Sequence, residues 1–229
     1  ENILKNEVLL MQHSFPLQHV NKSSKKDIDI SFIGSIFIGK TLHNKRVNLI
    51  YELIKNFRNT FIAINFSKNL IFTLIIRFIT SFFKFKLFKE INFLYKLIYI
   101  YFSCKKPIFG IAMYNLVSKS KILVNTHIDD TEYAGNMRLF EGTGLGCLVL
   151  TDKKKDLDKL FNIGQEIDVY ENVKDLVEKC KYYLSNEKKL NTVASSGQKR
   201  TIMDYNYEKR IVILDQYIKE KLKSNEKNL

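Results

Sequence analysis

The sequence predicts an α/β fold in which a Rossmann-like parallel sheet is flanked by helices. Short β-rich runs alternate with longer segments of helical spacing, which is typical of a parallel sheet with crossover helices. An apolar share of 45% in 229 residues is ample for a core. No G-x-G-x-x-G or Walker A pattern follows a predicted strand, so no phosphate-binding motif of those kinds is indicated. The predicted strands are 27–32, 60–66, 121–128, 147–150 and 166–170.

The segments between the predicted strands have helical periodicity. Residues 44–58 carry apolar side chains at 47, 50, 54 and 57, which form one face of a helix. Asn172 is expected to cap a later helix, and Gly197 to end another. Further helices are predicted over 110–120, 137–145, 156–161, 173–184, 187–200 and 205–222. The side chains expected to face inward include Met137, Phe140, Ile211, Leu214 and Ile218.

Residues 68–106 form an insertion of unusual composition. Many Phe and Tyr residues are interleaved here with Lys and Arg, and no uncharged run is long enough to cross a membrane. The charges do not share one helical face, so we expect two helices broken near 84–89. Such a basic, aromatic surface suits an anionic membrane or another domain, with plain packing on the core as the alternative. Stacking on nucleic acid is the least favoured interpretation.

Charge and cysteine usage restrict the function classes. The net charge of +13 favours anionic partners such as nucleotide diphosphates, although AT-rich coding sequence also produces lysine-rich chains. The cysteines lack the spacing of a metal site, so Cys147 and Cys180 are interpreted as small core residues in a reducing, cytoplasmic protein. No signal peptide is recognised at the N-terminus. Because the chain starts at Glu1, we interpret it as a fragment.

The most informative stretch for a ligand site is 121–152, which is interpreted as strand, polar loop, short helix and strand. His127 ends the first of these strands, and open α/β sheets bind ligands at the carboxyl ends of their strands. Asn136 and Arg138 start the helix, where main-chain amides and the helix dipole favour an anion. Glu141 follows on the same helix. The alternatives are a structural histidine and a surface pair between Arg138 and Glu141.

A second candidate is a glycine turn after the first strand. Gly34 and Ser35 follow the run 27–32, and such a turn lets main-chain amides approach a phosphate. A plain strand-to-helix turn with solvated lysines is the alternative. Positive charge is supplied by the residues that come next, Lys40, Lys45 and Arg46. Three later glycines are interpreted as helix termination and close packing, because they run from a helix into a strand: Gly142, Gly144 and Gly146.

Three linked segments resemble the C-terminal half of GT-B glycosyltransferases, with the group 1, CgeB-like family as the nearest match. They are NMRLFEGTGLGCLVLTD, LFNIGQEIDVYENVKDLVEKCKYYLSN and GQKRTIMDYNYEKR. The resemblance extends from about Asp27 to Leu214, and it is strong from Tyr114 onward. It implies three parts: 1–26 as a linker from an N-terminal domain, 27–223 as the Rossmann-like domain with its insertion, and 224–229 as a frayed tail.

The resemblance also implies roles for individual residues. Glu141, in the pattern F-E-x-x-x-x-G, would accept hydrogen bonds from the ribose hydroxyls of a nucleotide sugar. Tyr133 stands where many relatives have a second glutamate, so the donor-sugar contact of that glutamate cannot be carried over. Basic groups and helix dipoles would bind the diphosphate without a metal or other cofactor. The predicted nucleotide-sugar site comprises Glu141, Arg138, Asn136, Gly135, Tyr133, Gly34, Ser35, Arg46, Asn125 and His127.

These expectations describe the donor-binding half of a glycosyltransferase that acts in surface glycan or polysaccharide assembly. No catalytic residue is assigned, because the base is expected from the N-terminal domain. The expected partners are a nucleotide-sugar donor, a glycan or lipid-linked acceptor and the N-terminal domain, in the cytoplasm or on the inner face of the membrane. Two alternatives stay open: a non-catalytic nucleotide-binding fragment, and a basic protein that associates with membrane or nucleic acid through 68–106.

Overall fold

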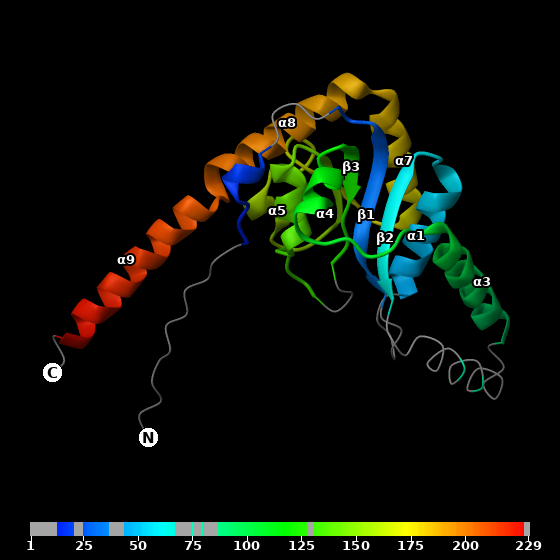
Figure 1. The fold of residues 1–229 in the computed structure, drawn as a ribbon, viewed down its shortest axis with the longest axis horizontal. Helices are drawn as coiled ribbons and strands as arrows, with labels where there is room; N and C mark the ends of the chain where they lie inside the picture. The colour runs from blue at the N-terminus through cyan, green and yellow to red at the C-terminus, as the bar shows by residue number, and fades with distance from the viewer. Residues whose placement is uncertain are drawn as a thin grey trace.

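The computed structural model describes residues 13–20, 25–36, 44–66, 75, 79, 87–127 and 131–226. These residues form a sheet in the order β2-β1-β3-β4-β5, and every neighbouring pair of strands is parallel (Figure 1). The chain runs from β1 to β2 and then continues with β3 on the other side of β1, so the winding reverses between β1 and β3. The predicted Rossmann-like sheet is confirmed. Its strands are β1 (Ile28–Ile36), β2 (Thr60–Phe66), β3 (Ser120–Val124), β4 (Leu148–Asp152) and β5 (Asp168–Tyr170).

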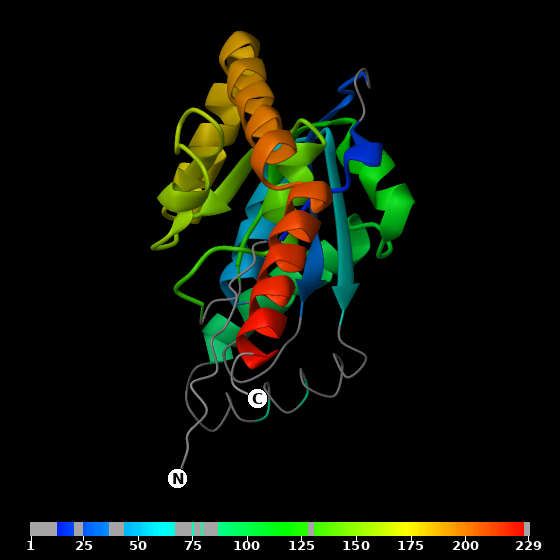
Figure 2. The ribbon, with the colours of Figure 1, turned by 90° about the vertical axis from the view of Figure 1, so that its left-hand side faces the viewer.

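Helices cover both faces of the sheet. In Figure 1, α4 and α5 lie to the left of the strands and α1 and α7 to the right. Figure 2, turned by 90°, shows α8 and α9 following one another across the front of the sheet in orange and red. The helices are η1 (Leu17–His19, a 3-10 turn), α1 (Asn44–Asn56), α3 (Leu87–Ser103), α4 (Gly110–Val117), α5 (Met137–Gly144), α6 (Leu157–Leu160), α7 (Val173–Ser185), α8 (Glu187–Asp204) and α9 (Tyr207–Glu226).

The alternation of side chains along the strands divides the core into two layers. Ile122 and Val124 of β3 belong to the layer with α1, α3 and α7. Leu123 between them belongs to the layer with α4, α5 and α6. The strand residues are buried on both faces, which explains why β3 and β4 are continuous apolar runs in the sequence. Cys147 and Cys180 are buried among these layers, as predicted.

The predicted turn at Gly34 and Ser35 is wrong. Both residues lie inside β1, which pairs with β2 as far as Ile36, opposite Phe66. The prediction ended the strand at the first glycine, but glycine is tolerated in a strand whose neighbour continues the hydrogen-bond ladder. The two residues therefore offer strand backbone, and not a phosphate-binding turn.

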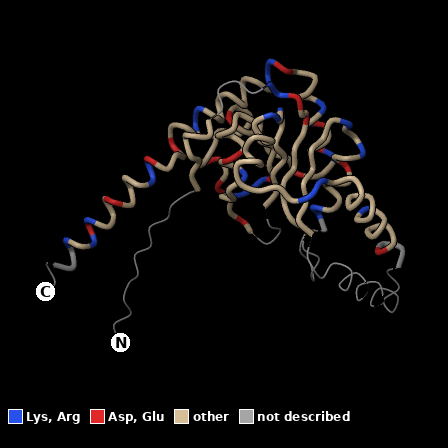
Figure 3. Tube along the Cα trace, viewed as in Figure 1, with Lys and Arg blue, Asp and Glu red and all other residues tan. Residues whose placement is uncertain are grey.

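Three predicted helix features are also wrong. Gly197 lies inside α8, where a Cβ would come 2.1 Å from the carbonyl oxygen of Glu166, so glycine serves close packing and does not end the helix. Met137 is half exposed at the start of α5. Ile211, like Leu214 and Ile218, is exposed because α9 extends away from the sheet with charges of both signs along it (Figure 3). Helical spacing identifies an apolar face but not the surface that covers it.

The insertion and the chain ends lie only partly within the described residues. α3 packs Leu97 and Ile100 against the core, whereas the first predicted helix of the insertion lies outside the described residues apart from Ile75 and Ile79. Phe15, from the expected linker, is fully buried and its amide donates to the carbonyl of Tyr205 at 2.7 Å. At the other end, α9 continues through Glu226 into the predicted tail. Within the described part of the chain, no helix is long and apolar enough to span a bilayer.

Candidate functional site

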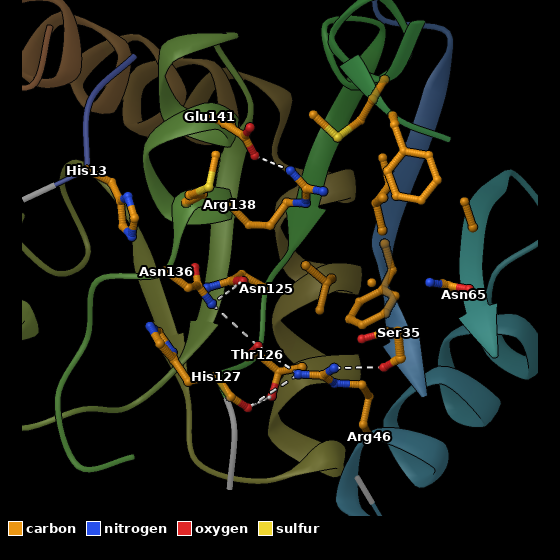
Figure 4. Close-up of a pocket in the computed structure, with 18 of the residues that line it drawn as sticks. His13, Ser35, Arg46, Asn65, Asn125, Thr126, His127, Asn136, Arg138 and Glu141 are labelled. Carbon is orange, nitrogen blue, oxygen red and sulfur yellow. Dashed lines mark hydrogen bonds and ion pairs between the residues drawn. The ribbon is translucent and has the colours of Figure 1, made fainter. Parts of the chain in front are cut away.

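A pocket of about 880 Å³ lies at the carboxyl ends of β1, β2 and β3 (Figure 4). It is placed where the winding reverses between β1 and β3, which is the usual ligand position in an open α/β sheet. Residues of α4, of the loop before α5 and of α5 complete its wall. The structure brings all ten residues of the predicted site into the lining of this one pocket, while their binding roles stay predictions.

Asn136 fixes the N-terminus of α5 at the pocket. Its side-chain oxygen accepts a hydrogen bond from the amide of Leu139 at 3.2 Å, which makes it the N-cap. Its Nδ2 donates to Oδ1 of Asn125 at 3.0 Å, and Asn125 donates in turn to Oγ1 of Thr151 at 3.0 Å. This series of hydrogen bonds ties α5 to the ends of β3 and β4. The positive end of the α5 dipole therefore belongs to the pocket wall.

Glu141 is 5% exposed and is held from two sides. Nη1 of Arg138 forms an ion pair with Oε2, and the hydroxyl of Tyr114 donates to Oε1 at 3.2 Å. The Arg138–Glu141 pair, which the sequence offered as a surface pair, is thus present, but both residues line the pocket. An ionised carboxylate has about four acceptor positions, so two donors leave capacity for ligand hydroxyls.

Tyr114 is a site residue that the sequence analysis missed. It lies on α4, and only the sheet topology brings α4 beside α5, so no local spacing relates Tyr114 to Glu141. Burial and the neighbouring carboxylate of Glu141 raise the pKa of Tyr114 to about 12. The hydroxyl therefore remains a hydrogen-bond donor at neutral pH.

Arg46 is buried in the pocket wall and joins β1 to β3. Its Nη1 donates to the carbonyl of Ser35 at 2.8 Å, and its Nη2 donates to the carbonyl of Thr126 at 3.2 Å. The carbonyl of His127 lies 3.5 Å from the same nitrogen. The guanidinium thus holds together the two strand ends at which the winding reverses, and its predicted pairing with phosphate stays a prediction.

His127 is buried beyond the end of β3 and is paired with Asp152, a second residue that the sequence analysis missed. Nδ1 of His127 lies 2.7 Å from Oδ1 of Asp152. Burial by itself raises the pKa of the Asp152 carboxyl, but hydrogen bonds and attraction to His127, together with Lys154, hold the pKa below its ordinary value. The available sequence signal was an acid at the end of β4, because parallel strands end at the same edge of a sheet.

The loop before α5 carries the remaining predicted residues. Tyr133 is exposed in the pocket lining, and Gly135 has a φ of 133°, a conformation that favours glycine. Glu132 forms an ion pair with Lys155 at 2.7 Å between exposed side chains and does not line the pocket. Glu132 therefore does not take the place of the second glutamate that many relatives have at the position of Tyr133.

Glycines allow α5 to lie directly on the sheet. A Cβ on Gly142 would come 2.4 Å from Cδ2 of Leu123, and a Cβ on Gly144 would come 2.5 Å from the ring of Phe15. Gly146, with a φ of 74°, follows the end of the helix. Helix termination and close packing are thus the roles of these glycines.

No group of three metal-ligating side chains occurs in the part of the chain that the structure describes.

Comparison with protein families identifies the chain. A sequence model of the glycosyl transferase-like family matches residues 99–216, which is more than half of the chain. This chain belongs to that family. A search of curated proteins found no match.

Solved glycosyltransferases share the fold at low sequence identity. HepE from Anabaena, solved with UDP and glucose, is 12% identical with a TM-score of 0.60, and the match covers 92% of this chain and 55% of HepE. Sucrose-phosphate synthase from Thermosynechococcus elongatus is 10% identical with a TM-score of 0.61, covering 93% and 52%. The C-terminal domain of LpcC, a group 1 glycosyl transferase from Francisella tularensis, is 11% identical with a TM-score of 0.55, covering 85% and 100%.

These coverages locate the fold within the larger enzymes. The chain spans about half the length of HepE and of sucrose-phosphate synthase, and it matches the whole C-terminal domain of LpcC. The prediction of a GT-B half of the C-terminal type is confirmed.

Proposed function

We propose that this chain is the nucleotide-sugar-binding half of a glycosyltransferase. The observation that carries the proposal is the meeting of a buried carboxylate, Glu141, with the N-terminus of α5 in one pocket at the strand ends. A fixed carboxylate accepts hydrogen bonds from the vicinal hydroxyls of a ribose, and a helix N-terminus attracts a diphosphate. Family membership, and the UDP present in the HepE structure, support this assignment.

The proposed reaction transfers a sugar from a nucleoside diphosphate to an acceptor hydroxyl. The bond between the anomeric carbon and the diphosphate oxygen breaks, a bond to the acceptor oxygen forms, and the acceptor proton passes to a base. The N-terminus of α5 and Arg138 stabilise the charge on the departing diphosphate, so the proposal needs no metal. We assign the base and the acceptor site to a separate N-terminal domain, and the product to surface glycan assembly at the cytoplasmic side of the membrane.

A thermal-shift panel with UDP, GDP, CMP and ADP tests the proposed donor site. A ligand that binds only the folded state adds about 2.7 kcal/mol to the free energy of unfolding at 100 times Kd. We expect one diphosphate to raise the Tm of the wild-type chain, and Glu141→Ala to abolish this rise. Each shift is measured against the Tm of the same variant without ligand, since loss of Glu141 also leaves Tyr114 and Arg138 without their partner.

Glu178→Ala is the matched control, because Glu178 is an exposed acid on α7 in a loose pair with Lys174. Its ligand-induced shift should equal that of the wild type. A shift that persists in Glu141→Ala would remove Glu141 from the ribose contact. No shift with any of the four nucleotides would contradict the proposed function of the pocket.

The outer face of α3 favours a second role, contact with an anionic lipid surface. Its exposed apolar residues recur at helical spacing, so they form one stripe opposite the residues that pack on the core. We propose a lipid bilayer as the partner because the stripe is aromatic and aliphatic, exposed Lys105 and Lys106 follow it directly, and the chain carries a net charge of +13. The stripe comprises Ile91, Tyr95, Ile98 and Phe102.

Co-sedimentation with vesicles tests this surface. The wild-type chain should sediment with vesicles that contain phosphatidylserine and much less with neutral phosphatidylcholine vesicles. The double variant Tyr95→Ser, Phe102→Ser should lose most of this binding, whereas Tyr182→Ser, an exposed tyrosine on α7, should retain it. Equal sedimentation of all three proteins would exclude the stripe as the lipid contact.

A further inference from the structure

The imidazole of His127 places an unpartnered nitrogen in the pocket wall. The side chain is 4% exposed, it lines the pocket, and its Nε2 has no hydrogen-bond partner among the described residues. Figure 4 shows the ring on the same side of the pocket as Asn136, the N-cap of α5. A buried polar nitrogen without a partner costs free energy, and such atoms at functional sites commonly await a ligand. Nε2 is therefore available for a hydrogen bond to a bound ligand.

Asp152 determines which nitrogen of the ring carries the proton. An ionised carboxylate only accepts hydrogen bonds, so Nδ1, which lies 2.7 Å from Oδ1, must carry a hydrogen. The same oxygen accepts the main-chain amide of His127 at 2.9 Å and the hydroxyl of Thr151 at 3.3 Å. Three donors thus anchor the carboxylate, and the ring is held with Nε2 as its remaining hydrogen-bonding atom.

The charged groups around this pair come from neighbouring elements. Nζ of Lys154, just after β4, lies 3.4 Å from Oδ2 of Asp152. Nη2 of Arg46, on α1, lies 3.5 Å from the carbonyl of His127. On β5, Tyr170 is neutral because burial and the charge of Asp152 raise its pKa. Among the described residues, Asp152 is the anion in contact with the imidazole.

We propose that Asp152 is a positioning residue that holds His127 so that Nε2, carrying a hydrogen, donates a hydrogen bond to an anionic oxygen of the bound nucleoside diphosphate. The proposal rests on the function proposed for the pocket. An imidazolium beside the N-terminus of α5 places two sources of positive potential against the same group. Asp152 makes no ligand contact in this arrangement and acts through His127.

Titration calorimetry with UDP and with uridine tests the proposal on the full chain. Asp152→Asn keeps an oxygen for Nδ1–H but removes the negative charge, and His127→Gln removes the imidazole. We expect UDP affinity to fall about 10- to 100-fold in His127→Gln, the range for a hydrogen bond between charged groups. Uridine affinity should stay the same, because uridine lacks the diphosphate. If the wild type binds GDP and not UDP, the pair GDP and guanosine replaces these probes.

The ratio of UDP affinity to uridine affinity separates positioning from a merely structural role. Asp152→Asn should weaken the binding of UDP and leave the binding of uridine unchanged, whereas a distorted pocket would weaken the binding of both. Asp168→Asn, which breaks an ion pair with Lys179 one strand away, is the matched control and should bind UDP as the wild type does.

The outcomes are distinguishable. No nucleotide binding by the wild type overturns the proposed function and this inference with it. Binding of UDP with equal affinity by the wild type, Asp152→Asn and His127→Gln overturns this inference alone. Parallel losses for UDP and uridine in Asp152→Asn also overturn it, because they indicate a distorted pocket and not a lost diphosphate contact.

Discussion

The hydroxyl of Tyr114 donates a hydrogen bond to Oε1 of Glu141 across 3.2 Å and so joins α4 to α5 in the pocket wall. Arg138 holds the other carboxylate oxygen. The carboxylate is therefore oriented by two donors before any ligand arrives. Preorganisation of this kind reduces the side-chain entropy that binding must remove.

Tyr114→Phe should weaken nucleotide binding without abolishing it. The variant removes one hydrogen bond to Glu141 and leaves the ion pair with Arg138 in place. A net contribution of about 0.5–1.5 kcal/mol for the lost bond corresponds to an affinity loss of about 2- to 12-fold for UDP. Titration calorimetry at neutral pH measures this loss.

Tyr183→Phe is the matched control for that experiment. Its hydroxyl donates to Oδ2 of Asp168 at 2.9 Å, another tyrosine–carboxylate contact, and neither residue lines the pocket. Both variants should lose similar stability, whereas UDP affinity should change only in Tyr114→Phe. Unchanged UDP affinity in Tyr114→Phe would show that the hydroxyl does not orient Glu141 for binding.

Phe15→Ala should destabilise the domain strongly, although Phe15 belongs to the segment expected to be a linker. The ring is fully buried and packs against Gly144 and Tyr114. Truncation of a buried phenylalanine costs about 3–5 kcal/mol of unfolding free energy. Urea unfolding measures the loss, with Phe102→Ala as the control, because Phe102 is 82% exposed. A loss below about 1 kcal/mol would mean that the N-terminal segment is not part of the cooperative core.

The sequence was sufficient to predict the sheet because β3 and β4 are apolar runs flanked by helices. The helical period of the apolar side chains also identified α1 and α7. The cap at Asn172 was predicted as well, and its side chain accepts a hydrogen bond from the amide of Asp175. Prediction failed where the outcome depends on what lies opposite an element. The apolar face of α9 is exposed, and position 197 requires glycine because the carbonyl oxygen of Glu166 leaves no room for a Cβ. Neither the exposure of α9 nor the close approach at Gly197 can be predicted from local spacing.

The sequence predicted the site residues that lie close together in the chain, and it missed those that lie far from them in the chain. Asn136, Arg138 and Glu141 lie on or beside one short helix, so their spacing and the family resemblance were enough to bring them together. Tyr114 reaches the pocket from α4, and Asp152, at the end of β4, contacts His127 in the pocket wall; these partners follow only from the order of the strands. Their roles could not be assigned before the strand order was known.

Gly197→Ala should be among the more destabilising single-atom additions in this chain. The added Cβ would come 2.1 Å from a main-chain oxygen, Glu166 O, which cannot rotate away as a side chain can. Overpacking of this kind costs about 1–3 kcal/mol or more. Thermal unfolding measures it, with Ser195→Ala on the exposed side of the same helix as control, expected within about 0.5 kcal/mol of the wild type. Equal Tm values would mean that α8 shifts freely away from the loop at Glu166.

Asp152→Asn should make the stability of the domain less sensitive to acid. In the folded chain the pKa of Asp152 lies below its ordinary value of 3.8, whereas unfolding restores that value. The unfolded state therefore takes up the proton first, so the stability from this carboxylate is present above its unfolded pKa and is lost as pH falls through its folded pKa. The variant should be less stable than the wild type by about 1–3 kcal/mol near neutral pH, and this difference should shrink below about pH 4. Urea unfolding across that range measures it, and Asp215→Asn, an exposed carboxylate on α9, should show no such convergence. A difference that stays constant from neutral to acid pH would show that the His127 contact does not depend on the charge of Asp152.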